Sequence, residues 1–98
     1  MQFSPDLRAG VIAGDVTVSF RLWKRPKVKV GGRYPFGDDH IEIDSIELLP
    51  FGSVSALDVR LSGERDRESL RRRAAHAGPI TDETVVYRVA FHVVRRAP

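Results

Sequence analysis

Side chains with chemical potential recur at every second position of one short stretch, GDVTVSFRLW. Thr17, Ser19, Arg21 and Trp23 alternate there with apolar residues, as in a β-strand that is buried on one face. Hydroxyls can hydrogen-bond a polar ligand, a guanidinium presents a planar fork of donors to a phosphate or a base edge, and an indole can stack on a base. The spacing therefore predicts a ligand-binding strand face centred on Arg21.

The segment that follows this strand is strongly basic. Positions 21 to 33 hold six basic residues and no acid, whereas positions 38 to 47 hold five acids and no Lys or Arg. A basic segment on one surface is typical of a protein that binds phosphate or nucleic acid. The alternative is a solvated loop that is balanced by its acidic neighbour. The residues predicted to contact phosphates are Lys24, Arg25, Lys27 and Lys29.

Each residue of the predicted strand face also has a purely structural interpretation. Arg21 can form an ion pair with Asp58 or bond a carbonyl group, and Thr17 and Ser19 can simply be solvated. Trp23 can close one end of the core with its N–H on a carbonyl, which is the interpretation that the sequence favours for it.

Several classes of site are excluded by composition. The chain has 98 residues and no cysteine, so it has no disulfide, no thiolate metal site and no cysteine nucleophile. His40, His76 and His92 are far apart and show no metal-ligand spacing. No phosphate-binding P-loop, dinucleotide motif or nucleophile elbow is present. We therefore expect no metal and no cofactor.

The pattern of apolar residues argues against a membrane partner. No apolar run approaches the roughly 20 residues that span a bilayer. The N-terminus also lacks the basic-then-apolar layout of a signal peptide. We expect a cytoplasmic location.

The first half of the chain predicts one helix and three strands. Ser4-Pro5-Asp6 is typical of a helix start, and Gly14 can end that helix. A strand is predicted over positions 15–23, and a short one begins at Tyr34-Pro35. A third strand holds Ile41 and Ile43, after which the apolar phase slips by one residue, so we expect a bulge near Asp44-Ser45.

The second half predicts two helices and a final strand. Val54, Leu57 and Leu61 indicate a short helix over 53–61, and Asp66 can cap a second helix that carries Leu70 and Ala74. The strand over 84–94 is largely apolar on both faces and is expected to be central in its sheet. This order predicts an α+β fold, a small curved sheet or β-barrel with helices at its mouth.

Three stretches, AGDVTVSFR, SGERDRESL and VYRVAF, stand in an order and spacing that resembles the ASCH domain, a branch of the PUA-like superfamily. Gly31-Gly32-Arg33-Tyr34 resembles the glycine turn that follows the first strand in that family. The resemblance covers nearly the whole chain, so residues 1–98 are expected to form a single ASCH-like domain. It implies a small PUA-like β-barrel, a cleft between barrel and helices, and RNA or a nucleotide-like molecule as the ligand.

Some small bacterial members of the family resemble amidohydrolases that act on N4-acetylated cytidine. The resemblance places their lysine on Val16, their threonine on Ser19, and their glutamate near Ser62 or Gly63, with Glu64 matching only if the alignment shifts. A hydroxyl nucleophile needs a base in contact with it, and valine cannot serve as one. The sequence therefore favours binding over catalysis and assigns no catalytic residue.

Three hypotheses follow from these residues. The first is a module that binds RNA or a nucleotide in a cleft, with the strand face as its floor and the basic loop as its rim. The second is a hydrolase that acts on a modified nucleoside or RNA, with Ser19 or Thr17 as nucleophile. The third is a protein-interaction module. The oligomeric state stays open.

Overall fold

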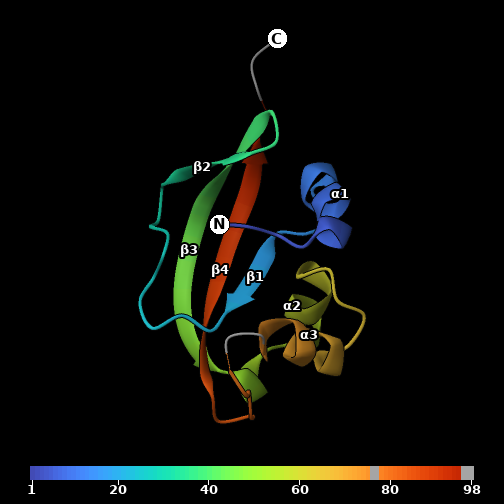
Figure 1. The fold of residues 1–98 in the computed structure, drawn as a ribbon, viewed down its shortest axis with the longest axis vertical. Coiled ribbons are helices and arrows are strands. Elements are labelled where there is room, and N and C mark those ends of the chain that lie inside the picture. The colour runs from blue at the N-terminus through green and yellow to red at the C-terminus, as the bar shows by residue number, and fades with distance from the viewer. Residues whose placement is uncertain (76–77, 96–98) are drawn as a thin grey trace.

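The computed structural model describes residues 1–75 and 78–95. Helices and strands follow one another there in the predicted order, with one additional 3-10 turn (Figure 1). Their bounds are α1 Pro5–Ala13, β1 Val18–Arg21, β2 Arg33–Phe36, β3 Asp39–Pro50, η1 Phe51–Ser53, α2 Ala56–Leu61, α3 Arg67–Ala74 and β4 Val85–Val94.

The strands form one antiparallel sheet in the order β1-β4-β3-β2. Strand β4 pairs with both β1 and β3, which confirms the prediction that the last strand is central. The register of β3 against β4 shifts between Ile43 and Ser45, so the predicted bulge is confirmed as well.

The α+β class is confirmed, but the closed barrel is not found among the described residues. Strands β1 and β2 are the two edges of the sheet, and they do not pair with each other in this part of the chain. The helices lie beside the β1 edge, while the loop after β1 crosses to the far side of β3 before it enters β2 (Figure 1). In this part of the chain β1 pairs only with β4 and β2 only with β3, so the sheet stays open.

Two apolar clusters cover the two faces of the central strand. Val86 of β4 belongs to the first cluster, whereas Val89 belongs to the second. The first cluster lies between the sheet, η1, α2 and α3, and its buried members include Val18, Phe20, Phe51, Val59 and Leu70. The second joins α1 and the basic loop to the sheet, and its buried members include Val11, Val28, Ile41, Ile43 and Phe91.

The first strand is shorter than the predicted 15–23, and Val16, which precedes it, does not share the face of Val18 and Phe20. The Thr17 amide donates to the Leu61 carbonyl, at 2.9 Å, so the chain enters β1 only at Val18. Val16 packs into the second cluster, whereas Val18 and Phe20 pack into the first.

The helix predicted over 53–61 begins later than expected, and its predicted stripe is partly wrong. Ser55 caps α2, because its Oγ accepts from the Asp58 amide at 3.0 Å. This start leaves Leu57 57% exposed and turns Val59 into the core instead.

The predicted helix boundaries are confirmed at three of the positions that could be compared. Gly14 ends α1 with a φ of 84°, and the Asp66 carboxylate caps α3 by accepting from the Ser69 amide at 2.8 Å. Pro5 opens α1, but the side chain of Ser4 makes no capping bond. His76 lies outside the described residues.

Candidate functional site

A cavity of about 450 Å³ lies against the outer edge of β1. Its walls come from four parts of the chain: the N-terminal segment, β1 with the start of the following loop, the end of α2, and α3. The volume falls within the range of small-molecule sites, which is roughly 300–1,000 Å³. The lining residues are Gln2, Phe3, Ser4, Leu7, Val18, Ser19, Phe20, Arg21, Leu22, Trp23, Lys27, Ser62, Leu70, Arg73 and Ala74.

Arg21 lies in the wall of this cavity and is held by neutral groups. Its Nε donates to Ser19 Oγ at 2.7 Å, and its Nη2 donates to the Gln2 carbonyl at 2.6 Å. The guanidinium carbon lies 5.2 Å from the centre of the Phe3 ring and 5.9 Å from that of Trp23. Burial lowers the pKa of Arg21. The site therefore holds a cation that has lost part of its hydration.

No carboxylate pairs with Arg21 among the described residues. Asp58, the ion-pair partner considered from the sequence, instead accepts from Arg88, with its Oδ2 at 2.7 Å from Arg88 Nε. Arg21 is opposite Tyr87 in the sheet, so it lies on the other face of β4 from Arg88. Asp58 sits on α2, which covers the Arg88 face.

The amino group of Met1 responds to the same positive charge. Its pKa is lowered, first by burial and second by the charge of Arg21.

Ser19 and Trp23 join Arg21 at the cavity, whereas Thr17 does not. Ser19 is buried, so its hydroxyl is not merely solvated. Trp23 is half-buried, and it both lines the cavity and packs on the second cluster, with its ring 5.9 Å from that of Tyr87. Thr17 is absent from the lining; its backbone bonds Leu61 and Phe91.

The basic loop contributes one of its four predicted residues to the cavity wall, namely Lys27. Lys24, Arg25 and Lys29 are exposed on the loop outside the cavity. They are close in sequence to Trp23 and Lys27, which line the cavity, but they do not line it themselves.

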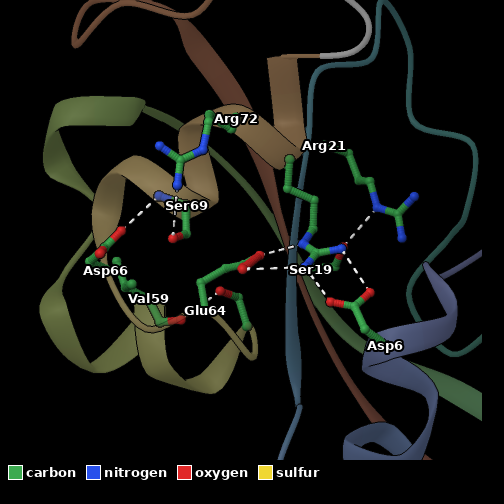
Figure 2. Close-up of polar contacts among 10 residues, drawn as sticks. Asp6, Ser19, Arg21, Val59, Glu64, Asp66, Ser69 and Arg72 are labelled. Carbon is green, nitrogen blue, oxygen red and sulfur yellow. Dashed lines mark hydrogen bonds and ion pairs between the residues drawn. The ribbon is translucent and has the colours of Figure 1, made fainter.

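Among the described residues, the ionisable side chains in the cavity wall are all basic: Arg21, Lys27 and Arg73. Arg73 is already engaged, because it donates to Glu64 and to Asp6, with Nη2 at 2.7 Å from Asp6 Oδ2. Figure 2 shows Glu64, after α2, and Asp6, on α1, pointing toward one another. Their hydrogen bonds raise the pKa of Arg73. Both carboxylates line a neighbouring hollow and not this cavity.

Much of the wall was not predicted by the sequence analysis, including its polar or aromatic residues Gln2, Phe3, Ser62 and Arg73. Gln2 and Phe3 precede α1, Ser62 follows α2, and Arg73 is on α3, so only the tertiary fold brings them to β1. Ser62 is buried and its hydroxyl donates to the Val59 carbonyl at 2.6 Å. No local pattern in the sequence marks these residues as neighbours of Arg21.

Val16 and Glu64, two of the positions that the family resemblance links to catalysis, are buried and make contacts within the fold. Val16 is 5% exposed and fills the space between Gly10 and Gly63; a Cβ on either glycine would lie 2.8 Å or 3.0 Å from Val16 Cγ2. Glu64 is buried, and both its oxygens accept from Arg73. Within residues 1–75 and 78–95, the wall contains no Asp, Glu or His, so no carboxylate or imidazole base of this part of the chain adjoins Ser19 in the cavity.

A separate polar cluster lies on the sheet, where Glu42, Asp44 and His92 bring their ligand-type atoms within 4.8 Å of one another. His92 Nδ1 lies 2.8 Å from Asp44 Oδ1, and Arg33 Nε donates to Glu42 Oε1 at 2.8 Å. That hydrogen bond lowers the pKa of Glu42. The cluster is a cross-strand polar network beside the β3 bulge.

None of the helices in the described part of the chain has the length and apolar character needed to cross a bilayer.

Comparisons with known proteins identify the fold. No family model matches the chain, and no curated protein matches its sequence. Among solved structures, the chain is similar to the crystal structure of an ASCH domain from Lactobacillus crispatus JV V101, with a TM-score of 0.73 and 19% identity. The match covers 93% of this chain and 72% of that one. The chain therefore has the fold of that ASCH domain, as its sequence motifs predicted.

Proposed function

We propose that the cavity beside β1 binds the phosphate-bearing part of RNA or of a nucleotide-like ligand. The observation that carries this proposal is Arg21, a partly buried guanidinium that lines the cavity and pairs with no carboxylate in the described part of the chain. A buried cation without a counter-ion is costly, and an anionic ligand relieves that cost.

The remaining wall supports the same ligand class. Lys27 adds a second cation, and the rings of Trp23 and Phe3 offer surfaces on which a base can stack. Lys24, Arg25 and Lys29 extend the positive charge outside the cavity, where a longer RNA backbone would run. The ASCH-domain fold is a PUA-like fold associated with RNA binding, which agrees with this assignment.

The hydrolase alternative has less support. Ser19 Oγ already accepts a hydrogen bond from Arg21, and among the described residues of the wall no carboxylate or imidazole is placed to activate it. We therefore expect binding without hydrolysis, by residues 1–98 acting as one cytoplasmic domain.

Substitution of Arg21 tests the proposal. Loss of one charge-assisted contact is worth about 1.5–3 kcal/mol, or about ten- to a hundredfold in affinity. Arg21→Ala is expected to lose at least that much, and Arg21→Lys to lose part of it, because lysine keeps the charge without the planar fork. The affinities are measured for structured RNA, single-stranded RNA and nucleotides at two salt concentrations.

The matched control is Arg60→Ala, which removes an exposed cation on α2, away from the cavity wall. It is expected to leave affinity within about twofold of the parent protein. The proposal is wrong if Arg21→Ala lowers the melting temperature sharply and leaves the affinity for every RNA and nucleotide unchanged. Robust turnover of N4-acetylcytidine that Ser19→Ala abolishes would instead establish the hydrolase.

A further inference from the structure

We propose that the outer backbone edge of β1 reads the hydrogen-bonding edge of the ligand's base, so that the ligand class is a nucleotide recognised through its base as well as its phosphate. This inference rests on the proposed function. It adds that the base of the ligand, as well as its phosphate, is bound in the cavity. It starts from the five consecutive residues 18–22, all of which line the cavity.

Consecutive residues of a strand point their side chains to opposite faces of the sheet. A cavity that touches all of residues 18–22 therefore cannot lie over one face of β1. It must lie along the edge of the strand, where backbone groups of alternate residues point outward.

The pairing with β4 identifies those residues. The Thr17 carbonyl accepts from the Phe91 amide at 3.0 Å, and Ser19 is opposite Val89 in the same ladder. In an antiparallel pair, hydrogen-bonded and non-hydrogen-bonded residues alternate. The odd-numbered residues of β1 therefore bond β4, and the backbone groups of Val18, Phe20 and Leu22 point toward the cavity.

These outward groups have no partner strand. Strand β1 is an edge of the sheet, and within residues 1–75 and 78–95 no loop, cap or side chain bonds the backbone of Val18, Phe20 or Leu22. Val18 and Phe20 are only 2% and 5% exposed. Buried N–H and C=O groups are nearly always paired, so these groups are suited to a ligand that carries donors and acceptors of its own.

A nucleobase has that property, because its edge presents hydrogen-bond donors and acceptors side by side. An extended peptide would also satisfy a free strand edge. Two features favour the nucleotide: the ionisable side chains of the wall that the structure describes are all cationic, and the rings of Phe3 and Trp23 can cover the face of a base.

Amide hydrogen exchange of the full chain, followed residue by residue by NMR, tests this. In the free protein, the Val18 and Phe20 amides are expected to exchange faster than those of Ser19 and Arg21, which serve as internal controls. The probes are uridine and adenosine 5′-monophosphates, ribose 5-phosphate, which lacks a base, and an extended valine-threonine tetrapeptide. A nucleotide at ten times its Kd is expected to slow exchange of the Phe20 amide about tenfold.

Ribose 5-phosphate is expected to shift the Arg21 side-chain signal without slowing the Phe20 amide. The inference is overturned, and the proposed function stands, if nucleotides shift the Arg21 signal but leave exchange at Phe20 unchanged. Protection of Phe20 by the tetrapeptide alone would also overturn it, in favour of strand addition. If no phosphate compound affects Arg21 or Phe20, both the inference and the proposed function fail.

Discussion

At the scale of single residues, the site is a cation whose direction is fixed before any ligand arrives. Ser19 Oγ and the Gln2 carbonyl each hold one nitrogen of Arg21, and aromatic rings flank its guanidinium. In the site that we propose, its remaining N–H groups bind the anion. Because the side chain is already ordered, binding loses little further rotamer freedom.

This arrangement makes Ser19 a positioning residue. Ser19→Ala removes the acceptor for Arg21 Nε, so the guanidinium gains freedom that binding must then remove. We expect affinity for single-stranded RNA to fall by about three- to tenfold, less than for Arg21→Ala. Isothermal titration calorimetry on both variants measures the difference.

Ser53→Ala, on the exposed turn η1, is the control for loss of a hydroxyl. A Ser19→Ala protein that binds like its parent, beside an Arg21→Ala protein that does not, would show that the Gln2 carbonyl is enough to orient the guanidinium.

The sequence predicted part of this site because alternation alone fixes the face of a strand residue. Arg21 and Ser19 could be paired in that way, and they do contact one another. Gln2 and Arg73 could not, because their approach depends on how α1 and α3 pack against β1. Arg21 could not be separated from Arg88 as the partner of Asp58 without knowing that α2 covers the opposite face.

At the scale of elements, the basic loop is a fixed part of the fold. Val28 is 5% exposed in the second cluster, and the Gly31 amide donates to the Ile43 carbonyl on β3 at 2.8 Å. Gly32 donates to Lys29 at 3.0 Å. The cations of the loop are therefore held at the surface on an anchored backbone.

If those cations contact phosphates, each one contributes to the salt dependence of binding. Four single substitutions test this: Lys24→Ala, Arg25→Ala, Lys27→Ala and Lys29→Ala. Each is expected to weaken RNA binding to a similar extent for all RNA sequences. Each is expected to lower the slope of log K against log salt by about one unit or somewhat less. Arg60→Ala is the matched control on α2. Slopes that stay unchanged in all four variants would remove the loop from the interface.

The turn after α2 requires glycine at position 63 for two reasons, its positive φ angle and the lack of space for a Cβ atom. Gly63 has a φ of 88°, and a Cβ there would lie 2.7 Å from Leu7 Cδ2. Gly14 has a similar φ of 84° with no atom within 4 Å of its Cβ position. Gly14→Ala is expected to cost about 1–2 kcal/mol for the backbone alone. Gly63→Ala is expected to cost about 2–5 kcal/mol, because crowding adds to the backbone term.

Urea unfolding of both variants measures the two free energies. Equal losses would mean that Leu7 moves aside at no cost, and that the contact between α1 and the turn is loose.

Element types were predictable where a local signal is strong, as at Gly14 and Asp66. The start of α2 was not predictable. Val54 is buried although it precedes the helix, so its spacing from Leu57 and Leu61 resembles that of a helical residue. Whether the sheet closes could not be predicted either, because it depends on whether β2 pairs with the outer edge of β1 in the tertiary fold.

At the scale of the whole molecule, Arg73 connects parts that are far apart in sequence. It donates to Asp6 on α1 and to Glu64 after α2 from its own position on α3. These three helices lie on the β1 side of the sheet (Figure 1). The cavity wall includes residues of α1, such as Leu7, and of α3, such as Leu70. The ion pairs therefore help to hold the cavity together.

The stabilising effect of Asp6 is expected to depend on pH in a defined direction. The hydrogen bond from Arg73 holds the pKa of Asp6 below its ordinary value of 3.8. A carboxyl with a lowered pKa stabilises the folded state above its ordinary pKa, and that stabilisation is lost as pH falls through the lower folded value. Protonated Asp6 resembles asparagine, so the effect of Asp6→Asn must vanish in acid.

We therefore expect Asp6→Asn to melt below the parent protein between pH 5 and 7, by no more than about 5 °C because the pair is exposed. The gap is expected to narrow below pH 3.8, and to shrink in high salt at neutral pH, where exposed pairs are screened. Asp15→Asn is the matched control, since Asp15 is exposed and has no ion pair among the described residues. Melting curves at a series of pH values measure both gaps. A gap for Asp6→Asn that widens in acid, or one equal to that of Asp15→Asn throughout, would show that Glu64 alone anchors Arg73 and that α1 is held at the cavity by its apolar contacts.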